Sequence, residues 1–185
     1  MRTLVLAGLL GLLGCTATPA TARLVPGERL GGLRLLARME TVDSLLGPPV
    51  YSDSGAGTTV ARYRTVVGGD SVELLLILTF EPTDDMRKDL QVARTVARVY
   101  RDTFDLGVGS SLEAFSAHYT LDGPLASYAT GADSVQVYDT GNGLAVEIDR
   151  AGVCRGVAVH VRDRYPTVNY RPDYPEMAVR EVTPR

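Results

Sequence analysis

The expected fold of the chain depends on one segment, Phe104-Asp-Leu-Gly-Val-Gly-Ser-Ser-Leu-Glu-Ala-Phe-Ser-Ala-His-Tyr119. It has the pattern of a strand end, a tight glycine turn and a short amphipathic helix. Leu112, Phe115 and Tyr119 follow helical spacing, so they share one apolar face. The serines of 110–111 precede this run and are suited to cap the helix. A helix this short is marginal alone, and it is expected to pack on a sheet.

A second copy of this pattern occurs earlier in the chain. A shift of 73 positions places Leu33 on Leu106 and aligns 33–46 with the quoted segment. The apolar residues of the earlier helix have the same spacing as those of the later one: Met39, Val42 and Leu46. Internal repeats are sought first, because missing one leads to the wrong fold.

Three strand-like runs follow each expected helix. They are 59–67, 71–80 and 93–100 in the first half, and 134–138, 144–149 and 155–162 in the second. The last runs align at a shift of 61, Arg94 on Arg155, which implies one insertion at 81–91. The sequence therefore predicts an α+β fold of two tandem helix-plus-antiparallel-meander repeats, with the helices packed on one face of the sheet.

The N-terminal segment has the pattern of an export signal. Leu4–Leu13 is apolar but too short to span a bilayer. The run Leu12-Leu-Gly-Cys15 resembles a bacterial lipobox, which predicts lipidation of Cys15. Ordinary cleavage after Ala22 is the alternative. The expected division is a signal peptide at 1–14, a tether at 15–28, repeat one at 29–104, repeat two at 105–170 and a tail at 171–185.

Composition limits the classes of partner. The net charge is −3 and no basic stripe is present, so nucleic acid is not indicated. No cofactor motif or metal-ligand spacing occurs, and none is predicted. Lipid on Cys15 would attach the chain to a membrane. Thr16 after the cysteine, by resemblance to Gram-negative lipoproteins, implies the outer membrane facing the periplasm.

The side of the sheet away from the helices is the expected binding surface. In the first strand Arg62 and Arg64 alternate with apolar residues, which places them on that side. Arg94, Arg98 and Glu147 are expected there on neighbouring strands. Arginines on a sheet face are often simply solvated, yet arginine beside tyrosine is typical of protein-binding hot spots. We expect this face and the insertion 81–91 to contact an envelope protein.

Other candidate residues have structural explanations. His118 and His160 lack nearby ligands in the sequence and are predicted to be structural. Cys154 follows Val153 and is predicted to be a small buried residue. The carboxylates of Asp84, Asp85 and Asp89 do not follow a calcium-loop spacing, so a short helix with an acidic start is predicted there.

A helix and a meander, twice over in an exported chain, resemble the SmpA/OmlA group of small outer-membrane lipoproteins and the β-lactamase-inhibitor fold. The matching pieces are Leu33–Pro49 and Leu106–Pro124. The resemblance implies protein binding through the sheet face and loops, without a shared active site. The expected function is a non-catalytic scaffold or protein-binding lipoprotein of the cell envelope. An inhibitor of an exported enzyme and a small periplasmic hydrolase using His118 or His160 remain alternatives.

Overall fold

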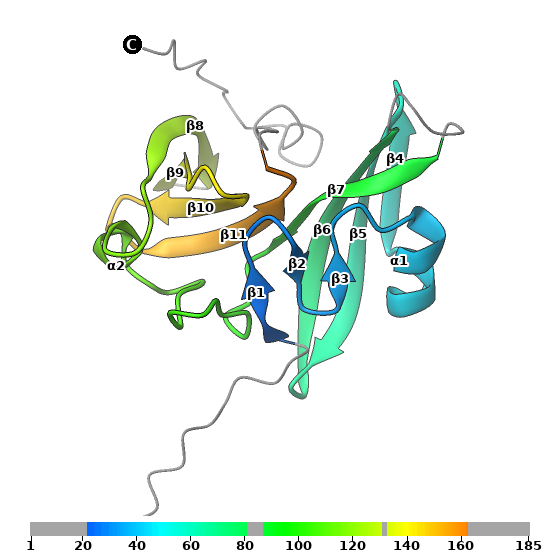
Figure 1. Ribbon diagram of the computed structural model, residues 1–185, viewed down its shortest axis with the longest axis horizontal. Coiled ribbons are helices and arrows are strands. Elements are labelled where there is room, and N and C mark those ends of the chain that lie inside the picture. The colour runs from blue at the N-terminus through cyan, green and yellow to red at the C-terminus, as the bar shows by residue number, and fades with distance from the viewer. Residues whose placement is uncertain (1–21, 81–86, 131–132, 163–185) are drawn as a thin grey trace, which may run out of the picture.

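The computed structural model describes residues 22–80, 87–130 and 133–162. Its main feature is an eight-stranded sheet in the order β4-β5-β6-β7-β11-β10-β9-β8, in which every neighbouring pair is antiparallel (Figure 1). The strands are β4 (Tyr51–Gly55), β5 (Thr58–Val67), β6 (Asp70–Phe80), β7 (Lys88–Thr95), β8 (Asp122–Thr130), β9 (Asp133–Asp139), β10 (Leu144–Asp149) and β11 (Cys154–His160). A small sheet contains β1 (Leu24–Val25), β2 (Arg29–Leu30) and β3 (Leu33–Arg34).

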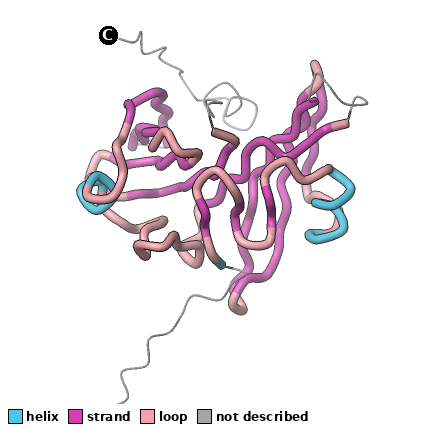
Figure 2. The backbone as a smooth tube through the Cα atoms, viewed as in Figure 1, coloured by secondary structure: helices cyan, strands magenta, loops and turns pink. Residues whose placement is uncertain are grey.

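The predicted α+β class is wrong, because the protein is mostly β. Strands make up 55% of the structure and helices 11% (Figure 2). The helices among the described residues are α1 (Met39–Leu46) and α2 (Leu112–Ser116). The apolar spacing predicted a helix at each of these places, but each helix extends over only one or two turns. Four strands follow each helix rather than three, and the small sheet was not expected, so the helix-plus-three-strand repeat does not describe the fold.

The larger core lies on one face of the eight-stranded sheet. Val42 of α1 and Phe115 of α2 are fully buried there, with apolar residues of β5, β6, β7, β10 and β11. Leu24, Leu30 and Leu33 of the small sheet join the same cluster. Ala22 and Leu24 are therefore core residues inside the segment expected as a tether. Burying this face supplies the packing that such short helices need.

A hydrogen bond between a tyrosine and an aspartate connects each helical region to the rest of the protein. Tyr63 of β5 donates a hydrogen bond to Oδ1 of Asp43 in α1 at 2.7 Å. Tyr119, just beyond α2, donates to Oδ2 of Asp102 at 2.6 Å. Burial is the main cause that raises the pKa of both phenols, and the hydrogen-bonded carboxylates add to it. Both phenols therefore stay protonated donors at neutral pH.

The strand boundaries explain where the sequence reading failed. β5, β6, β9, β10 and β11 lie close to the expected runs, but β7 begins at Lys88, inside the expected insertion, and ends at Thr95. β4 and β8 were not expected. β8 contains Pro124, and proline is tolerated in a sheet only where its missing N–H faces away from a neighbour, as at an edge.

Candidate functional site

The helix-free face is the side of the eight-stranded sheet opposite α1 and α2. Its central residues form a second apolar cluster that contains no helix residue: Val60, Leu75, Ile77, Val92, Ala126, Tyr128, Val135, Val137, Ala145 and Ala158. Strand alternation adds polar residues to this face, including Arg62, Arg64, Arg94 and Glu147. The expected placement of these four residues on the helix-free face is confirmed.

Arg94 lies on this face but is not available to a partner. Its Nε and Nη2 donate to the two carboxylate oxygens of Glu147 at 2.5 and 2.7 Å. Tyr128 of β8 donates to the same carboxylate at 2.5 Å. Glu147 is 0% exposed, and all three residues are buried. Arg94 is thus part of an internal network, which corrects its expected role as an exposed contact.

Gly156 makes this network possible. β11 lies between β10, which carries Glu147, and β7, which carries Arg94. Gly156 is the residue of β11 directly opposite Glu147. A Cβ at Gly156 would overlap Oε2 of Glu147. The missing side chain lets the glutamate cross β11 to reach Arg94 and satisfy an otherwise costly buried charge.

The outer strands carry several exposed side chains on the same face, beside the half-buried Arg62. Arg62 stacks over Tyr51 of β4, with its Cζ 4.9 Å from the ring centroid. Arg64 lies 3.9 Å from Glu73 on β6. Tyr51 and Val66 are 41% and 69% exposed. We call these residues the β4–β6 patch: Tyr51, Arg62, Arg64, Val66 and Glu73.

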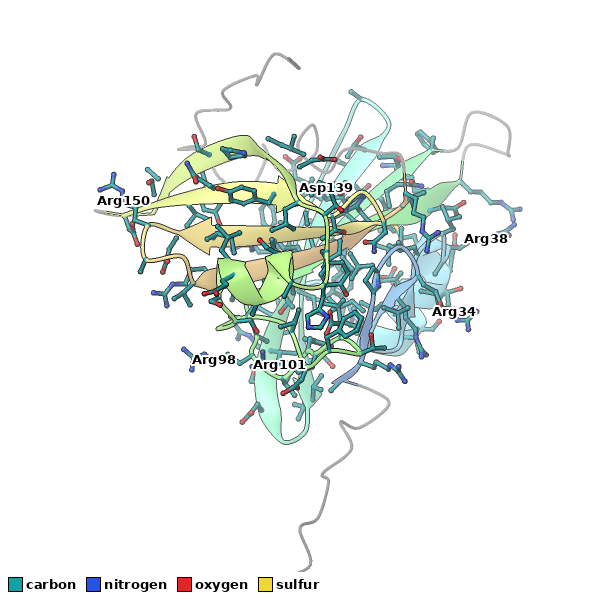
Figure 3. The ribbon with its side chains drawn as sticks, turned by 60° about the vertical axis from the view of Figure 1, so that its left-hand side comes forward. Arg34, Arg38, Arg98, Arg101, Asp139 and Arg150 are labelled. Atoms are coloured by element: carbon teal, nitrogen blue, oxygen red, sulfur yellow. The ribbon has the colours of Figure 1, made fainter. Side chains whose placement is uncertain are left out.

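Arg98 does not belong to the sheet. β7 ends at Thr95, and Arg98 lies in the following turn, exposed and directed outward (Figure 3). Its expected place on a neighbouring strand is wrong. Thr95 explains the early end, because its hydroxyl accepts from the N–H of Ala97 and donates to the carbonyl of Glu73.

The two histidines occupy different environments. His160 faces away from Val157 and Val159, as expected, and is buried. Its Nε2 lies 2.9 Å from Oδ2 of Asp139, at the end of β9. Its Nδ1 lies 2.9 Å from the carbonyl oxygen of Val161. His118 is exposed and stacks on Phe104 at a centroid distance of 4.2 Å. Among the described residues no group of three His, Cys, Asp or Glu side chains is arranged to hold a metal ion.

Cys154 is fully buried at the start of β11, as predicted. Burial, and secondarily the charge of Glu147, raise the pKa of its thiol to about 12. The thiol is therefore protonated at neutral pH and a poor nucleophile. Cys15, Asp84 and Asp85 lie outside the described residues, whereas Asp89 lies in β7.

The two edges of the large sheet differ. β8 carries Pro124, and its pairing with β9 is interrupted between Asp122 and Ala126. β4 pairs with β5 in unbroken register over five residues, and all five are exposed. No described strand pairs with the outer side of β4. Pro124 and the irregular register make it unfavourable for another strand to pair with the β8 edge. β4 has neither feature.

Comparison with known proteins finds no matching family, no matching curated protein and no matching solved structure. Within the described part of the chain, neither helix has the length and apolar character needed to cross a membrane. A functional proposal for this protein therefore depends on its own residues.

Proposed function

We propose that this protein is a non-catalytic binding module that recognises another protein through the β4–β6 patch. The observation that carries the proposal is the stacked Tyr51–Arg62 pair, flanked by Arg64 and exposed Val66. Tyrosine and arginine are among the residues most enriched at the energetic hot spots of protein interfaces. Stacking fixes both side chains before a partner arrives, which reduces the entropy lost on binding.

The buried network next to the patch supports this proposal. Arg94 of β7, Glu147 of β10 and Tyr128 of the edge strand β8 link three strands of one continuous sheet on the same face as the patch. The patch residues project from β4, β5 and β6, which are regular strands rather than mobile loops. Binding residues on rigid elements keep their geometry better than residues on loops do.

We also propose that the module works in the cell envelope of a bacterium. The lipobox-like run Leu12-Leu-Gly-Cys15 is the feature that supports export and lipid attachment. The proposed location is the outer membrane, facing the periplasm, with the partner an envelope protein. Replacing Cys15 by Ser should release the protein from the membrane fraction. Continued membrane retention, or a mature N-terminus at Arg23, would contradict the lipid anchor.

The decisive experiment is a charge reversal on the patch. After crosslinking, the amount of envelope partner recovered with the double variant Arg62→Glu/Arg64→Glu should be at least tenfold lower than with the unchanged protein. The reason is that two interface cations become anions. Arg34→Glu/Arg150→Glu is the matched control, since both arginines are exposed and lie away from the patch (Figure 3). Equal recovery by both folded double variants would exclude the patch as the binding surface.

A further inference from the structure

We propose that the outer edge of β4 binds an extended segment of a different polypeptide as a ninth strand of the sheet, with a Lys or Arg side chain beside Asp53. This inference deepens the proposed function and rests on it, because Tyr51 belongs to both β4 and the β4–β6 patch. The partner segment that is bound would be an extended strand, and main-chain hydrogen bonds to β4 would hold it.

The hairpin geometry identifies the backbone groups that face outward. Ala56 and Gly57 connect β4 to β5 with φ values of 47° and 83°, as in a two-residue type I′ turn. Such a turn places the flanking pair, Gly55 and Thr58, in hydrogen-bonded register. Hydrogen-bonded and non-hydrogen-bonded pairs then alternate along the ladder. The N–H and C=O groups of Ser52 and Ser54 therefore point away from β5, toward the open edge.

The side chains near these groups leave room for another strand. Ser52 and Ser54 are small, and the Ser54 hydroxyl is hydrogen-bonded to that of Thr59 at 2.8 Å. β4 contains no proline, lysine or bulge, which are three of the features that prevent strand addition, and Asp53 is its one charged residue. All five residues of β4 are exposed. Main-chain hydrogen bonds to such an edge supply affinity, and side-chain positions supply specificity.

Asp53 decides what kind of strand fits. A second copy of this chain, paired antiparallel with all four outward groups of Ser52 and Ser54 in use, would place Asp53 directly opposite its own copy. This would be a non-hydrogen-bonded pair, in which side chains approach most closely. Like charges directly opposite each other are destabilising, and opposite charges are favourable. The edge therefore disfavours self-association and favours a basic residue from another polypeptide.

The probe is a synthetic peptide, Thr-Val-Thr-Arg-Thr-Val-Thr, with blocked ends, compared with the same peptide carrying Glu at its centre. The alternation places the Arg beside Asp53 and the two valines on the same face, near Tyr51 and Gly55. The unchanged protein should bind the Arg peptide at least tenfold more tightly than the Glu peptide. Asp53→Lys should reverse this preference. Equal binding of the two peptides would overturn the proposal.

Proline substitution separates the edge from the patch. Ser52→Pro/Ser54→Pro removes only N–H groups that face outward, so the β4–β5 ladder should remain intact. This variant should lose at least tenfold in affinity for the Arg peptide, whereas the matched control Ser52→Ala/Ser54→Ala should bind normally. Binding by the proline variant that equals the alanine control would overturn strand addition. Partner recovery by Arg62→Glu/Arg64→Glu tests the proposed function separately.

Amide exchange in the unchanged protein gives a readout that needs no variant. At saturating Arg peptide, the amides of Ser52 and Ser54 should exchange more slowly, while that of Asp53, already bonded to β5, should change little. Unchanged exchange at Ser52 and Ser54 would refute the added strand. Dimerisation of the protein that is abolished by the proline variant would refute the assignment of the edge to a different polypeptide.

Discussion

The helix-free face carries two Arg–Glu pairs that differ in their surroundings. Arg64 and Glu73, on the outer strands, approach to 3.9 Å with side chains 63% and 47% exposed. Arg94 and Glu147, at the centre of the sheet, form two short hydrogen bonds with side chains 9% and 0% exposed. An exposed pair contributes little, because water screens it, whereas a buried pair becomes very costly when one partner is lost.

Strand alternation therefore assigns a residue to a face of the sheet but does not determine how deeply that residue is buried. Arg62, Arg64 and Arg94 share one face by the same rule of alternation. Arg94 is buried because its strand lies at the centre, between β6 and β11, and because Gly156 opens a path to Glu147. Position within the sheet therefore separates a structural arginine from a candidate contact residue.

The largest expected effect comes from breaking the buried pair. Glu147→Gln should lower the free energy of unfolding by about 3 kcal/mol, because the buried Arg94 guanidinium loses its counter-charge. Glu73→Gln is the matched control on the exposed pair and should change the same quantity by less than about 0.5 kcal/mol. Urea denaturation of both variants measures the two effects. Similar losses in the two variants would contradict the contrast between the pairs.

The two helices give a smaller comparison at their N-termini. Arg38 before α1 and Ser111 before α2 have nearly the same extended backbone, with φ/ψ of −68°/151° and −81°/156°. Ser111 accepts a hydrogen bond from the N–H of Ala114, whereas Arg38 provides no side-chain cap. The backbone at Arg38 is thus already arranged for a capping residue.

We therefore expect opposite changes from two substitutions. Ser111→Ala should destabilise the protein by about 1 kcal/mol, because the N–H of Ala114 loses its cap. Arg38→Ser should stabilise it by at most roughly 0.5 kcal/mol, because the N–H of Thr41 already donates to the carbonyl of Arg38 at 2.9 Å and the new Oγ would share that donor. Thermal and urea unfolding measure both. A destabilised Arg38→Ser variant would show that the arginine side chain contributes more than a cap supplies.

Several elements could be predicted because local pattern determines them. The serine cap of α2, the burial of Val42 and Phe115, and the orientation of His160 away from Val157 and Val159 all follow from spacing within one element. The chain turn between β9 and β10 also follows from local pattern, because Asp139-Thr-Gly-Asn-Gly143 is rich in turn residues and Asp139 accepts a hydrogen bond from the N–H of Gly141. Short-range chemistry decides these features.

Other features depend on residues far apart in the chain. β4 reads as a loop because Ser, Asp and Gly have low strand propensity, and only pairing with β5 makes it a strand. The Arg94–Glu147 pair joins β7 to β10 across β11, a placement that requires the strand order. A single charge inside the apolar run of β10, together with a glycine inside β11, was the available signal for a buried partner.

A pH-dependent effect is expected at the turn between β10 and β11. Asp149 accepts hydrogen bonds from the N–H groups of Val153 and Ala151 and from Nε of Arg155. The hydrogen bond from Val153 is the main cause that lowers the pKa of Asp149 below its ordinary value of 3.8, and it outweighs the opposing effect of burial. The carboxylate form is therefore bound more favourably in the folded protein than in the unfolded chain.

A depressed folded pKa fixes the sign of the pH dependence. The stabilisation from Asp149 is fully present above the ordinary pKa of an aspartate in the unfolded chain and is lost as the pH falls through the lower folded value. The difference in unfolding free energy between the unchanged protein and Asp149→Asn should therefore be constant near neutral pH and should shrink below about pH 4. Exchange of the Val153 amide should quicken over the same range. The amide of Thr58, in the β4–β5 hairpin whose turn residues Ala56 and Gly57 carry no carboxylate, serves as the comparison. A stability difference that persists unchanged at the lowest pH would show that the side-chain shape of Asp149, rather than its charge, holds the turn.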